Sequence, residues 1–207
     1  MPRGIKMKTY AENIKLKNAD EIVKKYYLQF LCIITYMDKN SFDSKIALIK
    51  QIATNIEYKL DEDEIEMLGI DFNSEKLNNM IPLVKEHKYS FIVDSFVIAN
   101  LSSKVDENVI SAIISIAEEL DFIKEDIEVL STLAGCIMKD NYDDLDKLQI
   151  NSSKWLGVVS EYIPEKWLEK RRMECDKAGK ILRATRDNAL DYYKRNVENQ
   201  ITFNMPP

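Results

Sequence analysis

The chain has 207 residues, 45% of them hydrophobic, so it is long enough to bury a sizeable core and fold unaided. Only five glycines and five prolines occur, too few for the tight turns of a β-sandwich or barrel, which favours an all-α bundle of about seven to nine helices. The formal net charge of −6 argues against polyanion binding by the whole surface, and therefore against nucleic acid as the default partner.

The first two predicted helices differ in character. Residues 20–37 are apolar on nearly all sides, which indicates a buried central helix. Residues 41–58 predict an amphipathic helix with Ser41 or Asp43 as its N-cap. The apolar face of this second helix is expected to contain Ile46, Ile49, Ile52, Ala53 and Ile56.

Two shorter helices follow. An acidic helix over residues 61–69 is expected to stop at Gly69, a plausible C′ residue. Residues 74–86 predict a further helix, in which Pro82 should kink the chain or restart the helix. These elements complete the first half of a helical bundle predicted over residues 20–150, after a polar lead at 1–19.

The second half repeats this order. Residues 88–101 are again apolar on most sides, and two amphipathic helices follow within residues 104–134. Asp106 and Glu107 stand where negative side chains cap a helix and complement its dipole. The predicted stripes contain, first, Val109, Ile110, Ile113, Ile114, Ala117 and Leu120, and second, Ile127, Leu130, Leu133, Ala134 and Ile137.

The two halves resemble each other in sequence. Residues 63–68 (DEIEML) precede residues 125–130 (EDIEVL) by 62 positions. The middle helices match best at an offset of 64 positions, which pairs Ile46, Ile49, Ile52 and Ala53 with Ile110, Ile113, Ile116 and Ala117. This pattern predicts two duplicated helical hairpin units around a shared core.

The segment FVIANLSSKVDENVISAIISIAEELDFIKEDIEVLSTLA, residues 96–134, resembles the tellurite-resistance TerB-like family. The resemblance covers roughly residues 20–146 and implies an all-helical accessory module of bacterial stress-response or phage-defence systems. It also implies an acidic, metal-associated patch of the kind proposed for some members. The family's Ala-Asp-Gly turn after the first helix is absent here: residues 99–103 read Ala-Asn-Leu-Ser-Ser, and residues 37–40 read Met-Asp-Lys-Asn.

Two interpretations apply to the carboxylates. The acidic residues can be solvated helix faces, as expected for Glu118 and Glu119, or they can form a metal site. With the Asp-Gly turn missing and no calcium-loop pattern present, we expect no metal ligands and no tight divalent site at the candidate acids Asp38, Asp43, Asp94 and Asp106.

Asp94 interrupts the apolar run FIVDSFVIA and is therefore singled out. It can share a narrow polar stripe with Ser90, Ser95 and Lys88, or it can be an acid with a shifted pKa in a groove. The tendency of charged residues to be exposed favours the polar stripe.

No catalytic motif is recognisable, so we expect neither an enzyme nor a cofactor. The single histidine, His87, has no second histidine with which to bind a metal and is expected near a helix junction at the surface. Cys32, Cys136 and Cys175 are widely spaced and odd in number, which disfavours disulfides. With no secretory signal or membrane span in the sequence, these features predict a cytoplasmic protein.

Residues 151–207 are predicted to form a C-terminal helical extension and tail. Residues 165–195 carry ten Lys or Arg against six Asp or Glu. This segment can dock on its own bundle, on another protein or on a phosphate backbone; interspersed acids disfavour the last. The protein-interaction candidates are Trp155, Tyr162, Trp167, Arg171 and Arg172, and the expected partner is another protein. A metal-responsive sensor and a nucleic-acid-binding accessory protein are the alternatives.

Overall fold

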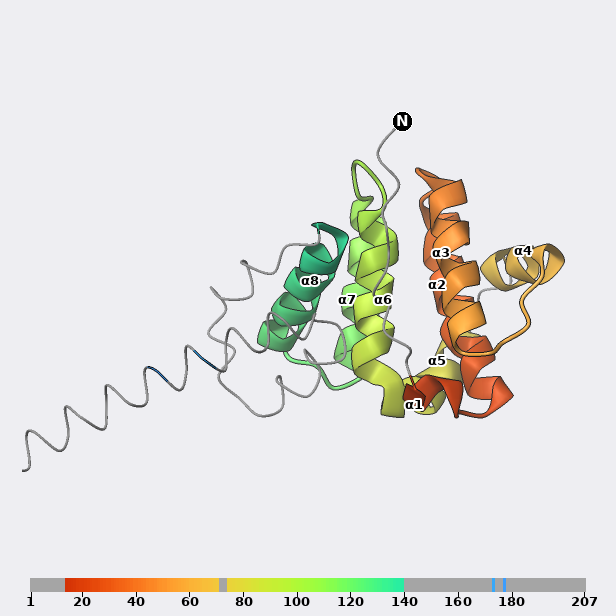
Figure 1. Ribbon diagram of the computed structural model, residues 1–207, viewed down its shortest axis with the longest axis horizontal. Coiled ribbons are helices and arrows are strands. Elements are labelled where there is room, and N and C mark those ends of the chain that lie inside the picture. The colour runs from red at the N-terminus through yellow and green to blue at the C-terminus, as the bar shows by residue number, and fades with distance from the viewer. Residues whose placement is uncertain (1–13, 71–73, 140–172, 174–176, 178–207) are drawn as a thin grey trace, which may run out of the picture. The chain divides into compact units, whose positions relative to one another are not determined.

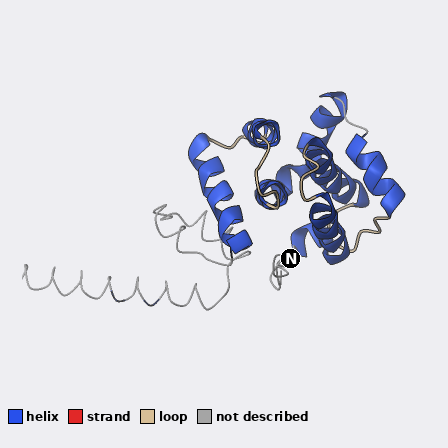
Figure 2. Ribbon diagram, turned by 90° about the horizontal axis from the view of Figure 1, so that it is seen from above, coloured by secondary structure: helices blue, strands red, loops and turns tan. Residues whose placement is uncertain are grey.

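The computed structural model describes residues 14–70 and 74–139, together with the isolated positions 173 and 177. The described chain contains helices and loops and no strand (Figure 2), which confirms the all-α fold class. The chain divides into two units, Met1–Ile163 and Pro164–Pro207. All the helices considered below belong to the first unit, and the boundary predicted at 150/151 lies outside the described residues.

The described helices follow the order expected from the hydrophobic pattern. The central helix of the first half extends to Met37, as predicted, and Asp20 precedes it as the N-cap residue. The elements are α1 (Ile14–Lys17), α2 (Glu21–Met37), α3 (Phe42–Asn55), α4 (Glu62–Ile70), α5 (Ser74–Val84), the 3₁₀ helix η1 (Lys85–His87), α6 (Lys88–Asn100), α7 (Glu107–Glu119) and α8 (Lys124–Lys139).

The two halves pack in the same way. In the first half α3 and α4 both contact α2, and in the second half α7 and α8 both contact α6 (Figure 1). The helices α2 and α6 contact each other and join the halves. Each half is therefore a central apolar helix with two amphipathic helices against it, as the sequence repeat predicts.

The loops after α3 and α7 repeat the same backbone geometry. The amide N of Tyr58 lies 2.8 Å from the carbonyl of Ala53, and that of Phe122 lies 3.0 Å from the carbonyl of Ala117. The preceding residues adopt left-handed conformations with φ of 57° and 64°. These residues are Glu57 and Asp121, which ion-pair with Lys17 and Lys85 at 2.9 and 2.8 Å. Equivalent residues of the two loops, such as Glu57 and Asp121, are 64 positions apart, which is the offset found between the middle helices.

The contact between α2 and α6 contains a buried polar pair. The Tyr27 hydroxyl donates a hydrogen bond to Asp94 Oδ2 at 2.6 Å, and the Tyr27 ring packs edge-on against Phe91 at 5.2 Å. Asp94 is only 3% exposed. The expectation that Asp94 lies on an exposed polar stripe is therefore wrong, because the side chain is buried in the interface that joins the two halves and is hydrogen-bonded there.

The neighbours expected on the same stripe also bond to backbone carbonyls. The hydroxyls of Ser90 and Ser95 are buried and donate to the carbonyls of His87 and Phe91 in the preceding turn. Lys88 reaches the carbonyl of Leu120 at 2.9 Å. The two serine hydroxyls therefore satisfy backbone acceptors instead of facing water, whereas Lys88 is half-buried.

The amphipathic helices mostly bury the predicted stripes. Val109, Ile113 and Ala117 in α7 are buried, as is Leu120 directly after it. The Asp106 side chain caps the helix by accepting from the Asn108 amide at 2.7 Å. In α3 the buried face is rotated: Leu48 replaces Ile46, which is only half-buried. Ser41 occupies the N-cap position of α3, in a left-handed conformation and without a side-chain capping bond.

Pro82 lies inside α5, which continues past it to Val84, so the helix does not restart at the proline. The 3₁₀ helix η1 follows from Lys85. His87 is the last residue of η1 and is half-buried, and its burial lowers its pKa. Across the described residues, no helix combines the length and apolar character needed to cross a membrane.

Candidate functional site

A groove lies between α3 and α4 on the face of the first half. Its volume is about 440 Å³, and its lining residues come from α3 and α4, with one aromatic residue of α2. Figure 1 labels these helices. A cavity of this size is within the range of ligand-binding clefts. The lining residues are Tyr36 from α2, Phe42, Asp43, Ile46, Ala47 and Lys50 from α3, and Glu62, Ile65 and Glu66 from α4.

The apolar part of the groove is built from aromatic and branched side chains. The rings of Tyr36 and Phe42 are T-shaped at 5.1 Å between centroids. Ile65 on α4 is buried, whereas Ile46 on α3 is half-buried. Ala47 is exposed, and its side chain is a single methyl group, so α3 projects little into the groove at that position. Ile46, which the sequence pattern places on the core-facing stripe, therefore lines this groove instead.

The charged part of the groove is acidic. Asp43, Glu62 and Glu66 contribute three carboxylates against the single ammonium of Lys50, a formal charge of −2. Lys50 already donates to Glu62 at 2.7 Å, which lowers the pKa of that carboxyl. Burial and then the negative charge of Glu66 raise the pKa of Tyr36, so the field of the acidic wall extends to the aromatic side chain in the lining.

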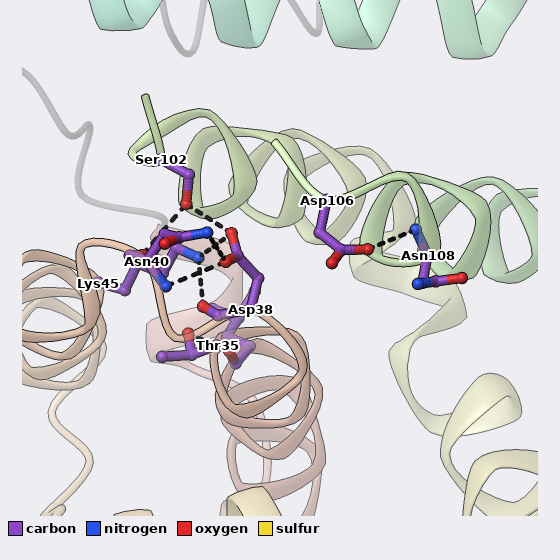
Figure 3. Close-up of polar contacts among 8 residues, drawn as sticks. Thr35, Asp38, Asn40, Lys45, Ser102, Asp106 and Asn108 are labelled. Atoms are coloured by element: carbon purple, nitrogen blue, oxygen red, sulfur yellow. Dashed lines mark hydrogen bonds and ion pairs between the residues drawn. The ribbon is translucent and has the colours of Figure 1, made fainter. Parts of the chain in front are cut away.

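The α3 wall is fixed at its beginning by a buried ion pair. The Lys45 ammonium lies 2.8 Å from Asp38 Oδ2 and also donates to the Asp38 carbonyl at 2.7 Å (Figure 3). The exposed fraction of the side chain is 0% for Lys45 and 3% for Asp38. Because Asp38 directly follows α2, this pair ties the first turn of α3 to the end of α2.

Asp38 also links the two halves of the bundle. The Ser102 hydroxyl, from the loop after α6, donates to Asp38 Oδ2 at 2.6 Å. Asn40 donates to Asp38 Oδ1 from its backbone at 3.0 Å and from its side chain at 2.7 Å. Burial alone would raise the pKa of Asp38, but the hydrogen bonds from Lys45, Ser102 and Asn40 and the charge of Lys45 outweigh it and lower the pKa to about 2.

The α4 wall is fixed by a close approach to α2. Gly69 lies inside α4, not at a C′ position with positive φ, so the expected helix stop at Gly69 is wrong. A Cβ atom at this position would overlap Cδ2 and Cε2 of the Tyr36 ring. The absence of a side chain at Gly69 therefore lets α4 pack directly on the aromatic residue that contributes to the groove.

Gly69→Ala is expected to lower the melting temperature and to displace the Tyr36 ring, because the added methyl group overlaps ring atoms. The expected cost is about 1–3 kcal/mol. Gly135→Ala in α8 is the matched control: no atom lies within 4 Å of its added Cβ, so the better helix propensity of alanine should raise stability by about 0.5–1 kcal/mol. Equal effects of the two changes in thermal unfolding would contradict the close packing of α4 on Tyr36.

The described residues do not fit the metal patch that the family resemblance implies. They contain no group of three or more His, Cys, Asp or Glu side chains placed to hold an ion. Each oxygen of the Asp38 carboxylate already accepts two hydrogen bonds, which uses the lone pairs that a metal would need. Asp106 accepts from the helix that it caps.

The cysteines and the predicted interaction residues are either buried or lie outside the described residues. Cys32 is buried, and burial together with the charge of Glu64 raises the pKa of its thiol to about 12, which keeps it protonated at neutral pH. Cys136 is also buried, and Cys175 lies outside the described residues. The interaction candidates in the C-terminal extension likewise lie outside the described residues; they are Trp155, Tyr162, Trp167, Arg171 and Arg172.

The groove itself is absent from the sequence-based candidates. The sequence contains one indication of the groove. Ile46 lies at the edge of the apolar stripe of α3, with Asp43 about one helical turn before it and Lys50 about one turn after it. Comparison of the chain with protein-family models, curated proteins and solved structures finds no match.

Proposed function

We propose that this chain is a non-enzymatic helical module that binds another protein through the groove between α3 and α4. The observation that carries the proposal is a groove lined by both apolar and charged side chains, whose two walls are each held in place by buried contacts. Preformed apolar grooves between helices are a recurrent way for proteins to bind amphipathic segments.

Two exposed apolar side chains lie close in sequence to lining residues. Ile70 follows Glu66 by one turn on α4 and is 64% exposed, and Met37 at the end of α2, directly after Tyr36, is 44% exposed. Neither residue lines the groove itself, so the two add to the proposal only as further exposed apolar surface on the helices that form it.

The biological setting rests on a separate argument. A regulatory role in bacterial stress response or phage defence follows only from the TerB-like resemblance, and it stays a prediction. Metal sensing and nucleic-acid binding also stay predictions; the former lacks a suitable cluster in the described residues, and the basic segment on which the latter depends lies outside them.

Ala47→Gln tests the groove as the binding surface. Ala47 is exposed on the α3 wall, and glutamine is a good helix former, so the change should narrow the groove without altering the melting temperature. Affinity capture with the full-length protein, quantified by mass spectrometry, should show at least a tenfold loss of the protein partner.

The control is Ser111→Gln. Ser111 occupies the position on α7 that corresponds to Ala47 at the offset of 64, and it is also exposed. This variant should recover the partner as well as the unchanged protein does. Recovery of the same proteins in the same amounts by Ala47→Gln would reject the groove as the binding surface.

A further inference from the structure

The length of the groove matches a short helix. Its α3 wall runs from Phe42 to Lys50, nine residues that span about 12 Å along the helix axis. Its α4 wall runs from Glu62 to Glu66, about one turn. An amphipathic helix presents apolar side chains at positions i, i+4 and i+7, which span a similar length.

The charges on the two walls determine which residues such a helix should carry on either side of its apolar stripe. Lys50 is already bonded to Glu62, so its charge is compensated within the groove. Asp43 on α3 and Glu66 on α4 remain, and the structure gives neither an ion pair with another described residue. A helix lying in the groove would therefore pass between two carboxylates, one on each wall.

We infer that the groove takes an amphipathic helix of a partner protein that carries Lys or Arg on both sides of its apolar stripe. This inference rests on the proposed function and adds the chemistry of the partner. Charge complementarity carries it: an ammonium or guanidinium on each flank would compensate Asp43 and Glu66, whereas acidic flanks would be repelled. Two copies of this chain repel each other overall, because each has a net charge of −6, which disfavours a second copy as the occupant although residues 165–195 are locally basic.

Three synthetic peptides of about 15 residues, long enough to form a helix on binding, test the inference. All have the same spacing of stripe positions. The first has leucine in the stripe and lysine or arginine on both flanks, the second has leucine with glutamate flanks, and the third has alanine with basic flanks. Fluorescence anisotropy with the full-length protein at low salt should show the first binding at least tenfold more tightly than either of the others. Its affinity should fall as salt rises.

Charge reversal of the groove gives the decisive comparison. Asp43→Lys combined with Glu66→Lys should invert the preference, so that the peptide with glutamate flanks binds more tightly than the basic one. Glu118→Lys combined with Glu119→Lys introduces the same charge on the exposed end of α7 and should leave the preference unchanged. Circular dichroism should show that both double variants remain helical.

The outcomes separate this inference from the proposed function. Equal affinity for basic and acidic flanks, or no binding by any peptide, overturns the inference. If Ala47→Gln still abolishes partner capture in that case, the groove remains the binding surface but selects its partner without these charges. A dimer in light scattering that Asp43→Lys with Glu66→Lys dissociates would identify a second copy as the occupant and would also overturn the inference.

Discussion

Ile113→Asp should unfold the protein or lower its free energy of unfolding by several kcal/mol. Ile113 is 0% exposed at the centre of the apolar face of α7. Aspartate there would place a carboxylate among apolar side chains and would also remove the contacts of a buried isoleucine. The described residues offer no basic side chain on this face of α7 that could pair with the new charge.

Urea unfolding monitored by circular dichroism measures this effect. Ser115→Asp is the matched control, because Ser115 lies on the same helix and is exposed. Its effect should stay within about 0.5 kcal/mol, as for most surface substitutions. Near-native stability of Ile113→Asp would mean that this face of α7 is not part of the core.

The second large effect is expected at the Asp38–Lys45 pair. Asp38→Asn would leave the Lys45 ammonium buried without a counter-charge, which should cost about 3–5 kcal/mol. Lys45→Met keeps most of the aliphatic packing but leaves the Asp38 carboxylate with only its neutral donors. The double variant should be more stable than the sum of the single effects predicts, by about 0.5–3 kcal/mol, because it leaves no unpaired charge.

The pH dependence provides an independent check on the same pair. The pKa of Asp38 is lowered from 3.8 to about 2 in the folded protein, so its contribution to stability is complete above pH 3.8 and disappears as pH falls toward 2. The shift corresponds to about 2 kcal/mol. Asp38→Asn should lack this part of the acid dependence; an identical acid profile in the variant would show that Asp38 does not titrate in this way.

Local sequence patterns are sufficient to predict the helices. The N-cap Asp106 and the stripe through Ile113 depend on residues within a few turns of one another, and the structure confirms both. The structure extends the offset of 64 positions to the loops at Glu57 and Asp121, where the same local hydrogen bonds end both helices.

The buried polar groups and the groove depend on contacts between distant segments. Asp94 is buried because Tyr27, 67 positions earlier, reaches it, and Asp38 receives Ser102 from 64 positions later. A charged residue in an apolar run does not indicate such a partner, so its general tendency to be exposed gave the wrong expectation for Asp94. Gly69 was misassigned for the same reason, since its role depends on the ring of Tyr36 on another helix.

We propose that a helical segment of a partner protein binds between α3 and α4. Methyl NMR of isoleucine-labelled full-length protein, titrated with the peptide that has leucine in its stripe and basic flanks, tests it directly. The methyl signals of Ile46 and Ile65 in the groove should shift with increasing peptide, whereas those of Ile113 and Ile127 in the second half should remain in place. Shifts confined to the second half, or no shift at Ile46 and Ile65 at saturating peptide, would contradict it.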